Sequence, residues 1–236
     1  MSLERLDKLV SSAGSVSRTD AKQLIKSGRV AVNGAVIKDC GFKTEDTSEI
    51  TIDGESVTYK KYVYYMLNKP KGVLSASNDK SRETVVDIIT ADVKRNGLFP
   101  VGRLDKDTTG LLIVTDDGDF GHNVISPKSM IEKEYYVLVD KPITEKDISI
   151  LEQGVTLVDG TKLRPAKVSV LSDDRCTVSI VITEGKYHEI KRMLGVVGAG
   201  VNELHRYRIG SVVLDDELDF GEYREMTHQE LLCLYK

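Results

Sequence analysis

Two Asx-Gly pairs divide the first 60 residues into short segments that must pair closely. Asn33-Gly34 separates the alternating apolar runs of RVAVNGAVI, and Asp53-Gly54 does the same within ITIDGESVT at residues 50–58. Both positions of such a two-residue turn need positive φ, which Asn, Asp and Gly adopt more readily than other residues. The sequence therefore predicts two β-hairpins in a segment of limited core size.

Two helices are expected ahead of these hairpins. The second should begin after Ser17, which suits an N-cap, and should stop at Gly28. The first is predicted from apolar residues at helical spacing, which are Leu3, Leu6, Leu9 and Val10. We therefore expect a small α+β domain over residues 1–60 and a second, larger domain over residues 61–236.

Charge is unevenly distributed within the first domain. The whole chain has 33 Lys and Arg against 37 Asp and Glu, so it lacks the overall basicity of many nucleic-acid-binding proteins. Residues 1–43, however, have eight basic and four acidic side chains, whereas residues 44–60 have one and five. The basic side chains could form an RNA-phosphate surface or an ordinary solvated face, and charge alone favours neither. Those on the second helix and the first hairpin include Arg18, Lys22, Lys26 and Arg29.

Strands predominate beyond residue 61. Alternating or continuous apolar runs predict strands at residues 62–67, 110–115, 133–139, 162–171 and 176–183. Helices are predicted at residues 83–93, 118–125, 144–153 and 187–198, with a last one beginning at Thr227, which has Glu230 at capping-box spacing. Many strands with few, scattered helices favour an α+β fold with a mostly antiparallel sheet over a doubly wound parallel sheet.

Several functional classes lack their sequence signatures. The chain has no GxGxxG motif, P-loop, HExxH or GxSxG, and its four histidines show no ligand spacing. Its three widely spaced cysteines include no CxxC pair, and no apolar run approaches the roughly 18 residues of a membrane span. We therefore expect a cytoplasmic protein with no cofactor, no metal and no membrane partner. A hydrolase is the least supported enzyme class.

The most unusual segment is GRLDKDTTGLLIVTDDG at residues 102–118. Asp105 should lie on a loop directly before a buried strand, a position that can expose a reactive carboxylate while fixing its place. An Asx turn or an ion pair with Arg103 would explain the same residue equally well. For Asp107 a turn-forming role is favoured.

Two further clusters combine tyrosines with cations. In EKEYYV (132–137), Tyr135 lies on one strand face, where ordinary core packing is the alternative to a functional role. TEGKYHEIKRM (183–193) should place His188, Lys191 and Arg192 on neighbouring turns of a helix, and ELHRYRIG (203–210) follows it. Such a surface suits an extruded base and its flanking phosphates, although a solvated helix and an edge strand would explain the charges too.

In this order, the three clusters resemble the active-site motifs of the RsuA-like family of pseudouridine synthases. GRLDKDTTGLL is similar to the motif with the catalytic Asp, here Asp105, and KEY to the motif that supplies an active-site Tyr, here Tyr135. EGKYHEIKRM is similar to the motif whose cation pairs with the Asp. Several relatives have Arg at the position of Lys191, so either Lys191 or Arg192 could be that cation. Further similar stretches are LNKPKG (67–72), ISP (125–127), VGAGVNELHRYRIG (197–210) and GEYREMT (221–227).

The resemblance covers nearly the whole chain, because residues 1–60 resemble the alpha-L RNA-binding domain that commonly precedes this catalytic domain. It implies isomerisation of a uridine without any cofactor, with Asp105, Tyr135 and Lys191 or Arg192 as catalytic residues. Arg103 would fill the place of the extruded base. RNA contacts are further expected from Lys186, His188, His205, Arg206, Arg18, Lys22, Lys26 and Arg29.

Within the family, the motifs most resemble those of enzymes that act on 16S ribosomal RNA. We therefore expect ribosomal RNA, within a partly assembled small subunit, as the partner of a protein taken by default to be a monomer. Two alternatives stay open. The same chemistry could act on large-subunit (23S) RNA, or the chain could be a catalytically silent RNA-binding or ribosome-assembly factor.

Overall fold

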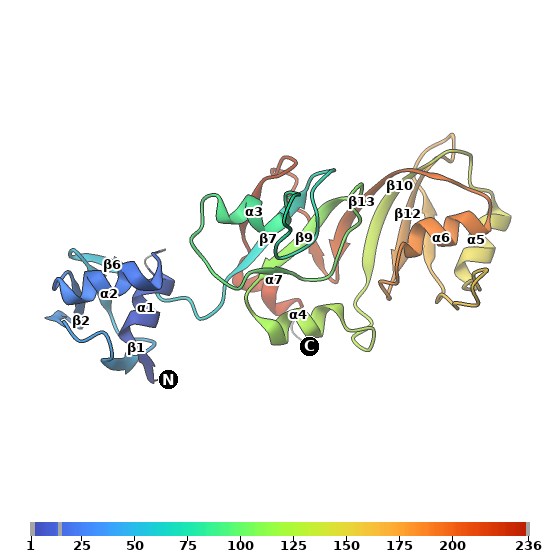
Figure 1. Cartoon of the computed structure of the whole chain (residues 1–236). Helices are drawn as coiled ribbons and strands as arrows, with labels where there is room; N and C mark the ends of the chain where they lie inside the picture. Colours follow the sequence, from blue (N-terminus) through green and yellow to red (C-terminus); the bar gives the residue numbers. More distant parts are fainter. Residues whose placement is uncertain (1–2, 14–15, 235–236) are drawn as a thin grey trace. The chain divides into compact units, whose positions relative to one another are not determined.

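The computed structural model describes residues 3–13 and 16–234, which divide into two compact units (Figure 1). The first unit contains the residues up to Val63 together with Ile89–Asn96, and the second contains Tyr64–Ile88 and the chain from Gly97 onward. Within the described ranges, no helix has the length and apolar character needed to cross a membrane.

The first unit packs two helices against short paired strands. Both predicted hairpins are present, with Asn33 and Asp53 at φ values of 50° and 54°. Ser17 caps the second helix by accepting a hydrogen bond from the Asp20 amide. The elements are β1 (Leu3–Arg5), α1 (Leu6–Ala13), α2 (Arg18–Lys26), β2 (Val30–Val32), β3 (Ala35–Val36), β4 (Lys43–Glu45), β5 (Ile50–Ile52) and β6 (Glu55–Val57). The first helix begins later than its apolar spacing suggests, because Leu3 belongs to a strand that pairs with β4.

The second unit is built on a nine-stranded sheet, as far as the described residues show (Figure 1). Its order is β11-β12-β10-β13-β9-β7-β15, with β14 beside β13 and β8 beside β9. The strands are β7 (Tyr64–Lys69), β8 (Phe99–Pro100), β9 (Thr109–Thr115), β10 (Lys133–Val139), β11 (Lys167–Val170), β12 (Thr177–Ile182), β13 (Val201–Ile209), β14 (Val212–Val213) and β15 (Tyr223–Glu225). Every pairing is antiparallel except that of β9 with β13, which confirms the predicted α+β class.

The helices beyond residue 63 are α3 (Val85–Thr90), α4 (Gly118–Ile125), α5 (Glu145–Glu152), α6 (Glu189–Val196) and α7 (His228–Leu232). Figure 1 shows α5 and α6 at the β10–β12 end of the sheet and α4 below β9, next to α7. Several boundaries differ from the predictions. The helix expected at 83–93 spans only Val85–Thr90, and the strand expected at 62–67 lies at Tyr64–Lys69. Two further differences have a clear local cause. The strand expected at 162–171 starts only at Lys167, because Pro165 has no N–H to donate to a ladder. The helix expected from residue 187 starts at Glu189, because His188 has a left-handed backbone with φ 48°.

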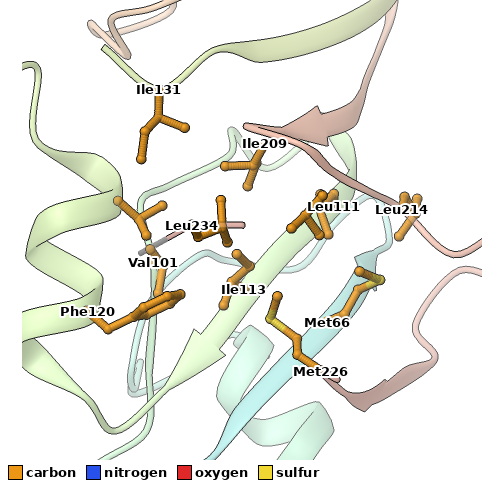
Figure 2. Close-up of a cluster of buried hydrophobic side chains, with 12 residues drawn as sticks. Met66, Val101, Leu111, Ile113, Phe120, Ile131, Ile209, Leu214, Met226 and Leu234 are labelled. Atoms are coloured by element: carbon orange, nitrogen blue, oxygen red, sulfur yellow. The ribbon is translucent and has the colours of Figure 1, made fainter. Parts of the chain in front are cut away.

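The main core of the second unit lies around β9, in which every residue is buried. Leu111 and Ile113 of β9 contact a buried cluster that includes Phe120 of α4 and Ile209 of β13 (Figure 2). Met66 of β7 belongs to the same cluster. Apolar residues of one cluster therefore come from strands on both sides of the β9–β13 junction.

That junction is short, and a glycine makes it possible. Only two residue pairs align in parallel across it, His205 with Thr109 and Arg206 with Gly110. Gly110 has φ 102°, and a Cβ atom built there would lie 2.3 Å from the Arg206 carbonyl oxygen. Glycine therefore lets the two backbones approach, and we call these two pairs the β9–β13 seam. The seam joins β11-β12-β10-β13 to β9-β7-β15.

We predict that Gly110→Ala destabilises the protein by about 3 kcal/mol or more, since a side chain would both strain the backbone and overlap the Arg206 main chain. Gly118→Ala is the matched control, because a Cβ at Gly118 meets nothing within 4 Å. Urea denaturation of both variants measures the difference. Equal midpoints for the two variants would contradict the role given to Gly110.

Candidate active site

A pocket in the second unit brings together side chains from both sides of the seam. Arg103 and Asp105, on the loop before β9, line it from one side. Tyr135 of β10 and Lys191 of α6 line it from the other, along with His188 from the turn after β12. These residues lie up to 88 positions apart in sequence, as Arg103 and Lys191 do. The fold therefore assembles in one place the three clusters that the sequence singled out.

The Asp105 loop is held from behind by the segment that follows β7. The Ser75 hydroxyl accepts a hydrogen bond from the Leu104 amide at 3.0 Å and donates one to the Leu104 carbonyl at 2.9 Å. The Gly72 amide donates to the Lys106 carbonyl at 2.8 Å. Both neighbours of Asp105 are thus fixed by backbone contacts, and its carboxylate is presented from a rigid support.

A fully buried lysine completes this support. The Lys69 ammonium donates hydrogen bonds to the carbonyls of Pro70 and Thr108, each at 3.0 Å, and of Lys106 at 3.4 Å. These bonds satisfy its donors, yet burial still penalises the charge and lowers the pKa of Lys69 to about 8. The stretch LNKPKG gave no local sign of this role for Lys69, because two of its three partners, Lys106 and Thr108, lie 37 and 39 residues away.

Lys191, rather than Arg192, is the cation beside Asp105. Its Nζ lies 3.4 Å from Asp105 Oδ2 and 2.8 Å from each carboxylate oxygen of Asp107. The Arg192 guanidinium instead binds Asp159, in the segment between α5 and β11. A turn-forming role was favoured for Asp107, and its ion pair with Lys191 was not predicted. The partner lies 84 residues away, so no local pattern indicates it.

The electrostatics of this group favour a charged lysine. Burial opposes the ammonium of Lys191, but the hydrogen bond to Asp107 and the charges of both carboxylates outweigh burial and raise the pKa of Lys191. The hydrogen bond from Lys191 lowers the pKa of Asp107 in turn. A lysine that stays protonated is therefore fixed 3.4 Å from Asp105, whose side chain is 27% exposed.

His188 approaches Asp105 from the turn that precedes α6. Its Nε2 lies 3.4 Å from Asp105 Oδ1, and its ring stacks on Tyr187. The sequence placed His188 on the helix, but its left-handed backbone puts it just before the first helical residue. Lys186 of the same turn binds the Lys162 carbonyl and Glu184, so its ammonium is already occupied.

Tyr135 is buried near three charged residues, which are Arg206, Lys133 and Glu189. The tyrosine is 7% exposed, and the Arg206 guanidinium carbon lies 6.0 Å from its ring centroid. Burial lowers the pKa of Lys133, two residues before Tyr135, to about 8, and raises the pKa of Glu189. Neither Lys133 nor Glu189 was predicted from the sequence as a site residue, although the two-residue spacing of Lys133 from Tyr135 places these two side chains on one face of β10.

Two residues expected to contact RNA lie away from the pocket surface. Arg206 is 4% exposed and its Nε donates to the Leu111 carbonyl, so its side chain reinforces the seam. His205 points to the opposite face of β13, where its Nδ1 is 2.9 Å from the Thr109 hydroxyl. Alternation along the strand explains why these neighbours diverge. Neither side chain is placed for direct RNA contact at the pocket.

The remaining side chains expected to contact RNA differ in whether they already have a partner within the protein. Arg103 is exposed and forms no hydrogen bond or ion pair with any described residue. In the first unit, Arg18, Lys22 and Lys26 share one face of α2 and are exposed, and their side chains likewise have no hydrogen-bond or ion-pair partner in the described ranges. Arg29 binds Asp53. No group of three His, Cys, Asp or Glu side chains that could hold a metal occurs among the described residues.

We predict a pH-dependent effect for Lys69→Met. The pKa of Lys69 is near 8 in the folded protein and near 10.5 when unfolded, so between these values the unfolded chain binds more protons and stability rises with pH. The rise due to Lys69 amounts to about 3 kcal/mol at most, and the variant should lack it. Urea unfolding of both proteins from pH 7 to 10.5 measures this difference, and parallel stability curves would contradict it.

Both parts of the chain are similar to known protein families. A model of the family described as RNA pseudouridylate synthase matches residues 63–195, and a model of the S4 domain matches residues 4–46. An uncharacterized RNA pseudouridine synthase of Bacillus subtilis is 44% identical, with 98% of each chain aligned. Ribosomal small subunit pseudouridine synthase A of Vibrio cholerae is 40% identical over 98% of this chain and 100% of its own.

A solved structure is similar over the same length. The crystal structure of a pseudouridylate synthase gives a TM-score of 0.69 at 36% sequence identity and covers 98% of this chain and 99% of that chain. The similarity therefore extends through both units and is not confined to the residues of the pocket.

Proposed function

The chain belongs to the RNA pseudouridylate synthase family, and from that membership we propose that it isomerises a specific uridine of small-subunit (16S) ribosomal RNA to pseudouridine. The family membership makes it an isomerase whose substrate is RNA. The 16S target is supported by a full-length relative named for the small subunit. The observation that carries the chemistry is the contact of Asp105 with Lys191 in the pocket that Tyr135 lines.

Asp105 begins the reaction in this proposal. Its carboxylate either attacks ribose C1′ or removes the proton of the 2′ carbon, and the bond from C1′ to ring nitrogen N1 breaks. On the first route, the ester bond between Asp105 and C1′ breaks as C5 of the turned uracil bonds to C1′. On the second route, Asp105 returns the proton to C2′ as that bond forms. On both routes the C5 proton then leaves to solvent while N1 takes up a proton. Atoms and electrons balance within the substrate and water. The ammonium of Lys191 lies 3.4 Å from this carboxylate, so its positive charge complements the group that either route uses.

Tyr135 and Arg103 act on the base in different ways. Tyr135 offers a ring face for the uracil, with a hydroxyl that can assist the later loss of the C5 proton. Arg103 is exposed at the same pocket and is free to enter the stack in place of the extruded uridine. Extrusion costs a few kcal/mol from a duplex and less from unpaired RNA.

RNA binding is assigned to both parts of the chain. Residues 1–60 would grip phosphates through the exposed cations of α2, as the S4 match supports, while residues 61–236 carry out catalysis. We further propose that the substrate is a partly assembled small subunit, that the protein is a monomer and that it works in the cytoplasm. Three free cysteines fit a reducing compartment.

We predict that Asp105→Asn lowers the rate of tritium release from RNA labelled at uridine C5 by at least about 100-fold, because an amide cannot serve as nucleophile or base. Asp119→Asn, an exposed position on α4, is the matched control and should retain full activity. The substrates are small-subunit and large-subunit ribosomal RNA and their precursor particles. Tritium release from large-subunit RNA alone would show that the substrate is 23S and not 16S RNA. No release from any substrate would favour a catalytically silent RNA-binding factor.

We also predict a sharp difference between neighbouring residues of α6. Lys191→Met should lower kcat by about 100-fold, since it removes the cation beside Asp105. Arg192→Met should change kcat by less than about threefold, since Arg192 binds Asp159 instead. Single-turnover tritium release at saturating RNA compares the two variants. A larger loss in Arg192→Met would overturn the assignment of Lys191.

A further inference from the structure

Tyr187 is the most exposed aromatic residue beside the pocket, with 74% of its surface accessible. It lies in the turn between β12 and α6, between two pocket-lining residues, Lys186 and His188. One face of its ring is covered by the His188 imidazole, with centroids 3.8 Å apart and planes inclined by 20°. The exposed surface of the ring therefore includes a face that no other ring of the described chain covers.

The turn that carries Tyr187 is fixed on both sides. The Lys186 amide donates to the Glu189 carboxylate at 2.7 Å, and the Lys186 ammonium donates to the Lys162 carbonyl. The His188 carbonyl accepts the Arg192 amide at 2.9 Å, within the first turn of α6. His188 itself has a left-handed backbone, a strained state that persists only where its surroundings impose it. Tyr187 is thus presented in a defined position before any ligand arrives.

The His188 ring connects Tyr187 with the catalytic carboxylate. Its Nε2 edge lies 3.4 Å from Asp105, while its face contacts Tyr187. His188 therefore lies between Tyr187 and Asp105, in contact with both. Arg103 and Lys106 are exposed on the adjoining loop and have no hydrogen-bond or ion-pair partner for their side chains in the described ranges. A planar ring face near unpaired cations suits a nucleobase attached to phosphates.

We propose that Tyr187, backed by the His188 ring, is a second base-stacking site that binds an unpaired nucleobase adjacent to the target uridine. The inference rests on the proposed function and adds a contact to it. Stacking at this site holds the neighbouring nucleotide while the uridine is extruded, because the two stacked rings give it a platform outside the pocket. Selection by stacking tolerates any base, so this site contributes affinity and strand position rather than base identity.

The test uses fluorescence of 2-aminopurine, which is quenched when the base stacks on an aromatic ring. The probes are two single-stranded RNA heptanucleotides with a central uridine, carrying 2-aminopurine on its 5′ or its 3′ side. Wild type and Tyr187→Phe should quench one of the two probes, whereas Tyr187→Ala should lose the quenching and bind about tenfold more weakly. Phe220→Ala is the matched control, since Phe220 is 63% exposed but lies against His205 on the opposite face of the sheet.

Equal quenching and affinity in wild type and Tyr187→Ala would overturn the proposal, as would a wild type that quenches neither probe or a Tyr187→Phe variant that behaves like Tyr187→Ala. With ribosomal RNA, Tyr187→Ala should raise KM about tenfold and change kcat by less than threefold. Because the binding titration needs no turnover, its result is independent of the tritium assay. A protein that quenches a probe through Tyr187 but releases no tritium would retain the stacking site and fail the proposed function.

Discussion

The close approach of β9 and β13 at Gly110 is the constraint on which the site depends. Asp105 precedes β9, whereas Tyr135 and Lys191 belong to the part of the sheet that includes β13. Two aligned residue pairs are the whole parallel contact between these parts, and the Arg206 side chain adds a hydrogen bond across it. The distance from the carboxylate to its cation is therefore set by backbone packing at the seam, with the shared apolar core holding both sides.

One lysine serves two carboxylates in this site. Asp107 takes the shorter contacts with Lys191, and Asp105 lies 3.4 Å from the same ammonium. The arrangement anchors Lys191 through a residue that need not react, and it leaves Asp105 oriented but less tightly bonded. Lys69 and Ser75 act from the other side of the loop, where they fix the backbone around Asp105. The position of Asp105 is thus fixed by Lys69 and Ser75, whereas the positive charge beside it comes from Lys191.

Local patterns predicted the hairpins, the helix caps and most strands, because turn-forming residues and apolar alternation can be recognised within a few residues of sequence. The residues themselves singled out the three clusters, and the resemblance to a family then implied catalytic roles for Asp105 and Tyr135. The features that the sequence did not predict depend on pairing between distant residues or on the conformation of the backbone. The parallel β9–β13 seam joins residues about 96 apart, Asp107 meets a partner 84 residues away, and the left-handed His188 interrupts an otherwise helical pattern. The burial of Arg206 follows from the same seam.

Lys191 and Arg192 are adjacent on α6, and successive residues of a helix project about 100° apart. Each binds a carboxylate from a different loop, Lys191 that of Asp107 and Arg192 that of Asp159. The rotation of this helix about its own axis is fixed by the packing of its buried residues, which are Glu189, Ile190, Met193 and Leu194. The direction in which the Lys191 ammonium faces Asp105 is therefore set by the buried face of α6, and a helix that has lost the Arg192 contact would still present that ammonium to the carboxylate.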